Sequence, residues 1–530
     1  MKVGHGLSVG VLQASFFTLA AIFIGLFLIR KLILRSRILK RLPPGPTPWP
    51  VIGNLPLLGA LPHVNLAKLA ERYGPLMSMR IGSINFLVAS SAKYAEEFLK
   101  TNDRIWASRV RTSASELLLY GSNDISSIPS GPRWRYARKI FTLELLTNKR
   151  LSDFQKSRRR VVVSSLNAML DQCAGGRAVR VDLVVSKMIV TIVSKMLMNE
   201  GNLSARAEAV KDSDEFQELM KDWFELLGVF NLGDYIPWLD RFDLQGYKKR
   251  MRIIAKKIDD FLQGIIDDHL EMHKLRKQTG EKEEDYVQDF DMVDVLLTSR
   301  RDADGQTLTL NEIKGIMENV IFGGTDTSAS TIEWALSALI RNPRVLQKAQ
   351  EELDATVGKE RLVEESDLPN LPYLQAVVKE TFRLHTVVPL LAPHVSTEAC
   401  TVDGYEIPAK TRLFVNLYAI HRDPEVWENP LDFYPERFLK QDKDLNGLDF
   451  DFLPFGSGRR MCPGKNLGLL FVHSILAVLI HGCEWRLPGE QRIEALDMRE
   501  RFGLSLAKEK PLEVVALPRL ARHIIGNDAS

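Results

Sequence analysis

Long stretches of the chain place apolar residues three and four positions apart, on one face of a helix. The clearest are 252–274, 309–341 and 343–357, where this period predicts amphipathic helices. Apolar runs of strand length are fewer, and they lie near 75–90 and 400–416, where they predict β-strands. The pattern therefore predicts a fold that is mainly α with small β-sheets.

The segment 309–341 is the longest of these patterns, and it begins with a Thr-x-x-Glu capping box and ends before a proline. Gly323 and Gly324 stand in its middle, although two glycines cost a helix about 2 kcal/mol relative to alanine. They would let a bulky group approach the backbone, and Asp326 and Thr327 could interrupt the helical hydrogen bonds beside them. The alternative is close packing against another helix, with a Thr hydroxyl bonded back to a carbonyl.

The N-terminal segment 7–29 is apolar and contains no charged residue. As a helix it would measure about 34 Å, enough to cross a bilayer. A cleaved signal peptide would have a shorter apolar core and a small-residue cleavage site. The basic residues at 30–41 outnumber Lys2 on the other side, so residues 1–29 are predicted to be a membrane anchor that leaves the rest of the chain in the cytosol. A buried core helix is the alternative.

A basic and proline-rich hinge is predicted at 30–50, because its prolines impose an extended and stiff backbone. No other proline-rich stretch of this kind follows in the sequence, so 51–530 is predicted to be one domain. The charged stretch 269–291 is predicted to be a solvated loop between helices.

Composition and charge exclude some classes of protein. Apolar residues make up 45% of the chain, which is enough for a large core, and the net charge of +3 gives no reason to expect nucleic-acid binding. The four cysteines are too few and too scattered for a disulfide framework, and this indicates a reducing compartment.

One of these cysteines, Cys462, lies in the glycine-rich and basic stretch PFGSGRRMCPG, residues 454–464. A phosphate-binding loop would carry Ser or Thr after its lysine, but Asn466 follows Lys465. The glycines would instead let backbone N–H groups turn toward the sulfur, while the arginines keep it as a thiolate.

Two further groups contain residues three or four positions apart, a spacing that places side chains on the same face of a helix. Glu380 and Arg383 are three positions apart and could be joined by Arg437, whereas Trp134 and Arg138 are four apart and could reach one anionic group. Taken singly, such patterns are more common as solvated surface pairs and as core tryptophans beside a surface arginine.

Together, these motifs resemble one family. The order WxxxR, GGTDT, ExxR, PERF and FxxGxRxCxG is similar to that of the cytochromes P-450, the haem-thiolate monooxygenases. The last pattern is highly specific, and every fixed position in it is filled: Phe455, Gly458, Arg460, Cys462 and Gly464. The chain looks most like the plant microsomal type that includes flavonoid hydroxylases.

The resemblance implies a cytochrome P-450 fold behind an N-terminal transmembrane helix, with haem b (iron protoporphyrin IX) as the cofactor. Cys462 would be the axial ligand of the iron, Thr327 would hydrogen-bond dioxygen and Asp326 would help to deliver protons. The implied cofactor-binding residues are Trp134, Arg138, His394, Phe455, Arg460, Cys462 and Gly464, and the implied structural triad is Glu380, Arg383 and Arg437.

This chain departs from the family at two positions. His394 stands where relatives often carry an arginine that faces a haem propionate, so that contact is expected to be weaker or to depend on pH. Val110 stands where a proline is frequent, which leaves the path of the following loop open.

The resemblance further implies hydroxylation of an apolar plant specialised metabolite, expected to be a phenolic or flavonoid, with O2 and with electrons from an NADPH-cytochrome P-450 reductase. The alternatives are a fatty-acid or terpenoid hydroxylase, an oxygen-independent isomerase or dehydratase, and a haem sensor. The expected location is the endoplasmic reticulum membrane, with a single pass and a cytosolic catalytic domain.

Two sets of residues complete these expectations. A basic dock for the reductase is predicted from the cations beside the haem motifs, namely Arg133, Arg135, Lys139, Arg459 and Lys465. Substrate contacts are expected from 108–129, 228–242, 319–323, 386–392 and 502–506, which include Phe230, Tyr235 and Trp238.

Overall fold

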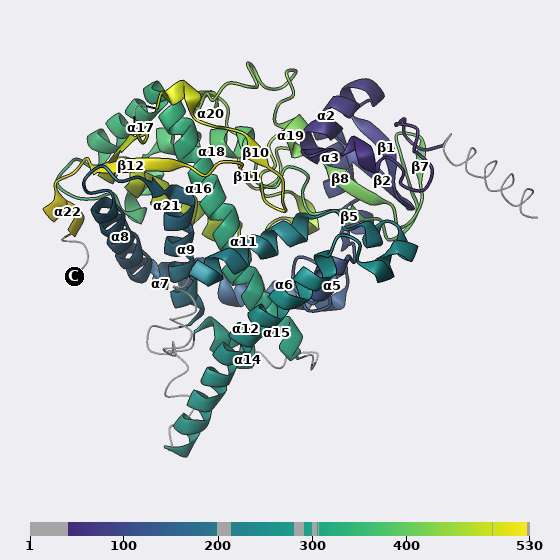
Figure 1. Cartoon of the computed structure of the whole chain (residues 1–530), viewed down its shortest axis with the longest axis horizontal. Helices are drawn as coiled ribbons and strands as arrows, with labels where there is room; N and C mark the ends of the chain where they lie inside the picture. Colours follow the sequence, from purple (N-terminus) through teal and green to yellow (C-terminus); the bar gives the residue numbers. More distant parts are fainter. Residues whose placement is uncertain are drawn as a thin grey trace, which may run out of the picture.

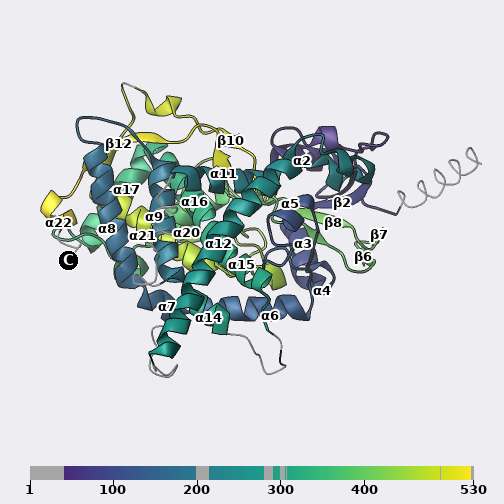
Figure 2. The same ribbon diagram turned by 60° about the horizontal axis from the view of Figure 1, so that its bottom comes forward.

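The computed structural model describes residues 41–198, 214–279, 291–298, 305, 307–489 and 491–526. Helices form most of the body, and the main β-sheet lies to one side of it (Figure 1 and Figure 2). The predicted segment 1–29 lies outside the described residues. The mainly α fold with small sheets is confirmed.

The longer helices are α2 (Pro62–Tyr73), α6 (Pro132–Ile140), α8 (Gln155–Gln172), α9 (Val181–Leu197), α11 (Asp214–Gly228), α12 (Tyr247–Gln278), α15 (Leu310–Glu318), α16 (Gly324–Arg341), α17 (Pro343–Thr356), α18 (Pro372–Leu384) and α21 (Lys465–Gly482). The shorter ones are α3 (Ala92–Glu96), α4 (Asp103–Trp106), α5 (Ser113–Leu117), α7 (Asn148–Asp153), α14 (Met292–Thr298), α19 (Leu417–Ile420), α20 (Arg437–Lys440) and α22 (Arg522–Gly526).

The main sheet has the strand order β1-β2-β8-β5-β3. Its strands are β1 (Leu76–Ile81), β2 (Ile84–Ala89), β3 (Ser108–Arg109), β5 (His394–Val395) and β8 (Arg412–Val415), and only the β2–β8 pair is parallel. The smaller sheets are formed by β4 (Val179–Arg180), β9 (Cys483–Arg486) and β12 (Glu513–Pro518), by β6 (Cys400–Val402) and β7 (Tyr405–Ile407), and by β10 (Glu500–Arg501) and β11 (Ala507–Lys508).

Helix α16 runs through the middle of the helical body and packs against α9, α18 and α21 (Figure 1). Helix α21 is apolar on all sides and mostly buried, as expected of a helix in the centre of a large core. Within the described residues it is also the one helix long and apolar enough to cross a membrane, with 61% of it buried inside the protein.

The predicted helix at 309–341 is present, but it is not uniform. Thr309 and Glu312 form the predicted capping box at the start of α15. A wider π-helical turn, η7 (Asn319–Gly323), then separates α15 from α16. The interruption expected beside Asp326 therefore lies one turn earlier, directly before Gly324. The space beside Gly323 is open, whereas a Cβ at Gly324 would contact Val193 at 3.9 Å.

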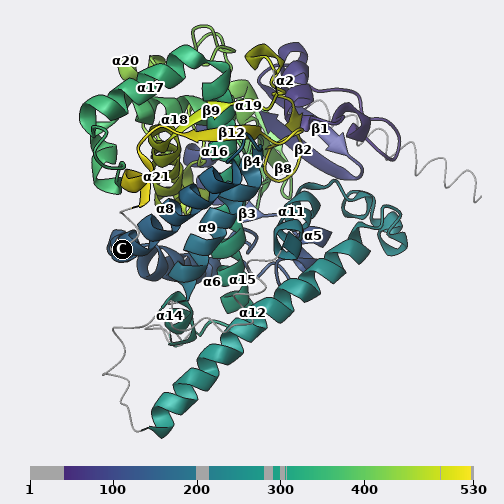
Figure 3. The ribbon, with the colours of Figure 1, turned by 60° about the vertical axis from the view of Figure 1, so that its left-hand side comes forward.

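The prediction of a solvated loop at 269–291 is wrong at both of its described ends. Helix α12 continues to Gln278 and is seen at full length in Figure 3. His269 is buried on this helix, and its Nε2 lies 2.9 Å from a carboxylate oxygen of Asp291, which is also buried. Glu271, Lys274 and Lys277 are exposed as expected, but they lie on a helix and not in a loop.

The described part of the proline-rich hinge lies against the main sheet. The carbonyl oxygens of Pro43 and Pro44 accept hydrogen bonds from Ser78 of β1, at 2.6 and 2.9 Å. Asn54 donates to Pro46 and Thr47, at 3.2 Å each. Because these bonds reach back into the sheet, the segment from Pro43 onward is attached to the domain.

Candidate active site

Cys462 lies in the loop that precedes α21. Its backbone N–H donates to Phe455 across the loop, at 2.9 Å, and the Gly464 N–H donates to its sulfur. Gly458 makes the loop possible, since its φ is +66° and a Cβ there would lie 2.1 Å from the Leu99 carbonyl oxygen. The predicted turning of backbone donors toward the sulfur is present in the structure.

The charge environment of this thiol differs from the prediction. The Cys462 side chain is exposed to the cavity. The surrounding protein nevertheless withdraws it from bulk water, which raises its pKa by more than the Gly464 N–H, Arg138 and Lys465 lower it. The cations that favour the thiolate are Arg138 and Lys465, and not the two arginines of the cysteine loop. A metal cation at the sulfur would deprotonate it outright, so the loop suits a metal-bound thiolate better than a free one.

Cys462 faces a cavity of about 180 Å³ between α16, α21 and the loop after α18. Thr327 of α16 lines the same cavity, together with Phe455 and Gly456 of the cysteine loop. The residues 387–388 and 391–392 of one predicted substrate segment line it as well. The structure thus brings together motifs that are more than one hundred residues apart in sequence.

Cationic side chains gather beside this cavity. Arg138 donates to the Met461 carbonyl at 2.8 Å, and Arg460 donates to the Ala107 carbonyl at 2.6 Å. Burial, with repulsion by Arg109 and Arg138 as the smaller cause, lowers the pKa of Arg460 to about 9. An anionic group seated here would relieve this repulsion.

Trp134 takes part in the same group. The guanidiniums of Arg460 and Arg138 lie 4.2 and 5.6 Å from the centre of its ring. Its indole Nε1 is buried and has no hydrogen-bond partner among the described residues. Because a buried donor without an acceptor is costly, an acceptor on a bound group would complete the site. These residues fit haem, whose acidic side chains supply both the charge and the acceptors.

The sequence interpretation missed Arg109. It lies on β3 directly opposite His394 of β5, and its guanidinium donates to the Ala392 carbonyl at 2.5 Å. It therefore places a cation beside the histidine that stands where an arginine was expected. The available signal was WASRVRT, in which two arginines lie within a predicted contact segment, but the pairing of β3 with β5 could not be read from the sequence.

His394 itself is buried, and its Nδ1 donates to the Trp106 carbonyl at 2.9 Å. Burial lowers its pKa well below the usual value, and Arg109 and Arg460 add to this effect. These effects favour the neutral form of the side chain, which lines the cavity at Cys462.

The two predicted oxygen-handling residues point to different partners. The Thr327 hydroxyl donates to the Gly323 carbonyl at 2.9 Å and borders the cavity. The Asp326 carboxylate instead accepts a hydrogen bond from Ser505. Burial raises the pKa of Asp326, while Ser505, Lys221 and Arg501 lower it by less.

The predicted triad is present and buried. Arg383 makes two hydrogen bonds to Glu380, both of 2.8 Å, and the Arg437 Nε lies 3.2 Å from each carboxylate oxygen. None of the three side chains is more than 5% exposed. The triad therefore joins α18 to α20, away from the cavity.

The predicted substrate aromatics separate in the structure. Phe230 and Tyr235 pack together in a cluster with Phe502. Trp238 is 64% exposed and does not line the cavity at Cys462. Hydrophobicity alone could not tell which of these rings faces inward.

The predicted dock divides in a similar way. Arg135 and Lys139 are exposed on α6. Arg133 is paired with buried Glu312, and Arg459 with Asp103 at 3.2 Å. Lys465 donates to the neutral Asn446 side chain at 2.7 Å. Arg135, Lys139 and Lys465 therefore carry charge that is not engaged in an ion pair among the described residues.

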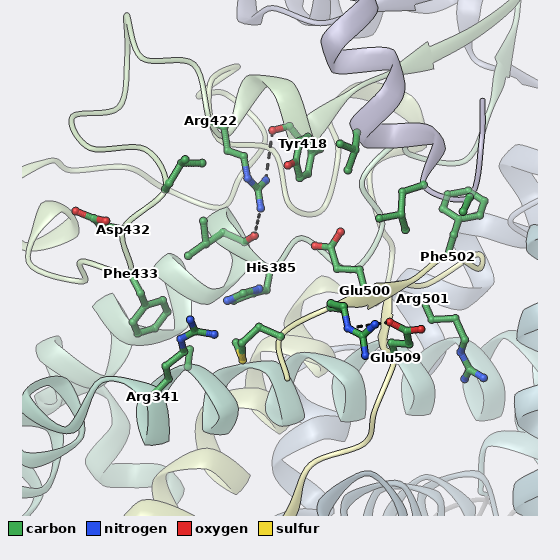
Figure 4. A pocket seen from close by; sticks show the side chains of 18 of the residues that line it. Arg341, His385, Tyr418, Arg422, Asp432, Phe433, Glu500, Arg501, Phe502 and Glu509 are labelled. Carbon is green, nitrogen blue, oxygen red and sulfur yellow. Dashed lines mark hydrogen bonds and ion pairs between the residues drawn. The ribbon is translucent and has the colours of Figure 1, made fainter. Parts of the chain in front are cut away.

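A second cavity, of about 990 Å³, lies near the carboxyl end of α16 (Figure 4). His385 and Arg422 line it from one side, and β10 with Phe502 lines it from another. It contains no cysteine and none of the predicted catalytic residues. The chemistry therefore belongs to the smaller cavity at Cys462.

Comparisons with known proteins agree with this geometry. A family model described as cytochrome P-450 matches residues 43–515. A flavonoid 3',5'-hydroxylase of Solanum melongena is 41% identical over 91% of this chain and 92% of its own, and a flavonoid 3'-monooxygenase of Arabidopsis thaliana is 41% identical over 92% and 93%. A solved zebra fish cytochrome P-450, determined with progesterone, has a TM-score of 0.70 at 26% identity, and the match covers 86% of this chain and 99% of that one. The predicted family is confirmed, and the chain belongs to the cytochromes P-450.

Proposed function

We propose that the protein is a haem-thiolate monooxygenase that hydroxylates a flavonoid, with dioxygen and with electrons that originate in NADPH. The observation that carries this proposal is the cavity shared by Cys462 and Thr327 in a chain about two-fifths identical to flavonoid hydroxylases. Haem b is the proposed form of the cofactor. When bound, it would supply dioxygen activation and the one-electron steps.

The residues of the chain would bind the haem, contact the substrate and deliver protons. Cys462 would hold the iron, and Arg109, Arg138, Arg460 and the Trp134 indole would hold the acidic side chains of the haem. The apolar side chains of 387–388 and 391–392 would face the substrate and exclude water. Thr327 would donate a hydrogen bond to dioxygen, and the adjacent Asp326 would help to deliver protons.

A planar phenolic substrate suits the apolar lining of the cavity. Val387, Val388 and Leu391 provide the aliphatic surface, and no carboxylate side chain lines the cavity within the described residues. Aromatic ligands gain most of their affinity from such surfaces, while a few polar groups fix their orientation. The relatives named above act on flavonoids, which have this character.

The location and the redox partner form part of the same proposal. The uncharged segment 7–29 and the basic residues after it would hold the protein in the endoplasmic reticulum membrane by a single pass, with the catalytic domain in the cytosol. Arg135 and Lys139 on α6 would contact an acidic NADPH-cytochrome P-450 reductase. Deleting residues 1–41 should release only part of the protein from membranes, because Trp238, Phe242 and Leu244 are exposed apolar side chains.

The decisive experiment combines purified full-length protein with reductase and NADPH and screens four classes of compound. A flavanone such as naringenin, a phenylpropanoid, a fatty acid and a terpenoid are tested separately. The proposal expects a substrate-induced spectral shift and a product one oxygen atom heavier with naringenin. Turnover of the fatty acid or the terpenoid alone would refute the flavonoid assignment, and turnover without NADPH would refute the monooxygenase assignment.

A further inference from the structure

The Asp326 carboxylate is held by a turn that lies far from it in sequence. Ser505, in the turn between β10 and β11, donates its hydroxyl hydrogen to Asp326 Oδ2. Ser505 is 7% exposed. A buried hydrogen bond to a carboxylate is among the stronger ones in proteins, and it restricts the position of the group that accepts it.

The turn is anchored on the carboxyl side of Ser505. The Leu506 N–H donates to the Val387 carbonyl at 2.7 Å, and the Trp334 indole donates to the Leu506 carbonyl at 3.0 Å. Leu506 is therefore bound both to the loop that lines the active cavity and to α16.

On the amino side of Ser505, the turn touches the end of α11. A Cβ at Gly228 would lie 2.2 Å from the Leu504 nitrogen and 2.4 Å from the Gly503 carbonyl carbon. The two backbones are thus in direct contact, and no side chain larger than hydrogen fits between them. A displacement of α11 would therefore push directly on the residues before Ser505.

The opposite side of this hairpin has room to move. Glu500, Arg501 and Phe502 line the cavity of about 990 Å³ described above (Figure 4). A turn that is pressed by α11 on one side and borders a cavity on the other can shift without compressing a packed core.

We propose that Ser505 is a positioning residue for Asp326, and that α11 sets the place of Ser505 through the contact between Gly228 and Leu504. The inference rests on the proposed monooxygenase function. In productive turnover, NADPH, a proton, O2 and the substrate yield NADP⁺, water and the hydroxylated product. When a proton is not delivered where it is needed, NADPH, a proton and O2 yield NADP⁺ and hydrogen peroxide instead.

The first test replaces the hydroxyl of Ser505. S505A, S505T and the control S337A are assayed with reductase, NADPH and naringenin, and product and peroxide are measured per NADPH. Ser337 is a suitable control because it is also buried and lies on α16, and its hydroxyl donates to the Glu333 carbonyl of the same helix at 2.7 Å. S505A should raise the ratio of peroxide to product about tenfold, as expected for the loss of one hydrogen bond to a carboxylate. S505T and S337A should remain close to the parent protein.

A pH profile separates positioning from a general loss of structure. Burial raises the pKa of Asp326, and the Ser505 hydrogen bond opposes it. Without that bond the pKa should rise further, so the pH dependence of coupling should move upward in S505A and stay in place in S505T. A profile that keeps its midpoint in S505A would overturn the positioning role.

The second test changes Gly228 on α11, away from Asp326, and measures deuterium exchange of the backbone instead of enzyme activity. G228A places a methyl group against the turn. The control is G264A on α12, where no atom lies within 4 Å of the added methyl group. Deuterium exchange of the peptide that covers 500–508 should be faster in S505A and G228A and unchanged in G264A. G228A should also raise peroxide, and adding it to S505A should have little further effect.

These outcomes distinguish the two proposals. If naringenin is not hydroxylated but exchange in 500–508 responds to G228A and S505A, the flavonoid assignment fails and the link between α11 and the turn stands. If exchange does not respond to either variant, the link is refuted, whatever the substrate.

Discussion

Replacing Glu380 with alanine should destabilise the protein more than any comparable surface change. The carboxylate accepts two hydrogen bonds from Arg383 and two longer ones from Arg437, and it also accepts the Tyr434 N–H at 2.8 Å. E380A leaves two buried guanidiniums without this anion. Breaking a buried ion pair from one side costs about 3–5 kcal/mol, out of a total stability of about 5–15 kcal/mol for a typical domain.

The assay is denaturant unfolding of the purified haem-loaded protein, followed by haem absorbance and by circular dichroism. The control is D367A, which removes another carboxylate that binds both terminal nitrogens of an arginine. Asp367 accepts from Arg361 at 2.7 and 2.8 Å, but the Arg361 side chain is 45% exposed. Water replaces such a pair, so its loss should cost about 0–1 kcal/mol. Asp367 also accepts the Glu364 N–H at 2.9 Å, and the loss of this cap should add about 1 kcal/mol.

The difference between the two variants tests the reasoning. If E380A loses no more stability than D367A, the buried triad does not contribute as its geometry implies. E380Q provides a further check, because it keeps the size of the side chain but removes the charge, and it should remain closer to E380A than to the parent protein.

Four further predictions follow from the same structure. C462S should lose the carbon monoxide difference spectrum typical of a thiolate-bound haem, and retention of that spectrum would refute the ligand assignment. T327A should bind haem and naringenin normally but release more hydrogen peroxide per NADPH, which a peroxide assay measures. Burial raises the pKa of Glu333 from 4.5 to about 7. Between these two pH values the folded protein keeps a proton that the unfolded chain has lost, so the free energy of unfolding should fall as the pH rises. E333Q should reduce this fall, as measured by denaturant titrations at pH 5 and 8. Reversing Arg135 and Lys139 to Glu should raise the reductase concentration needed for half-maximal rate, most clearly at low salt, whereas a loss of haem content alone would assign these residues a structural role.

Local features of the chain could be predicted because their causes are local. The Thr309 capping box, the helix interruption near Gly323 and the turn at Gly458 depend on neighbouring residues and on backbone geometry. The cysteine loop is likewise contained in one short stretch, so its motif identified the family. Long amphipathic periods predicted the helices for the same reason, since a period of 3.6 residues is a property of the segment itself.

The tertiary structure decided what depends on contacts between distant segments. Arg109 reaches the active cavity only because β3 pairs with β5. The pKa of Cys462 is raised because its withdrawal from bulk water outweighs the nearby charges, and this withdrawal cannot be counted from a motif. The bond between Ser505 and Asp326 joins residues 179 positions apart. A sequence shows which groups are available, but the distances between them, and therefore their charges and hydrogen bonds, arise only when the chain packs.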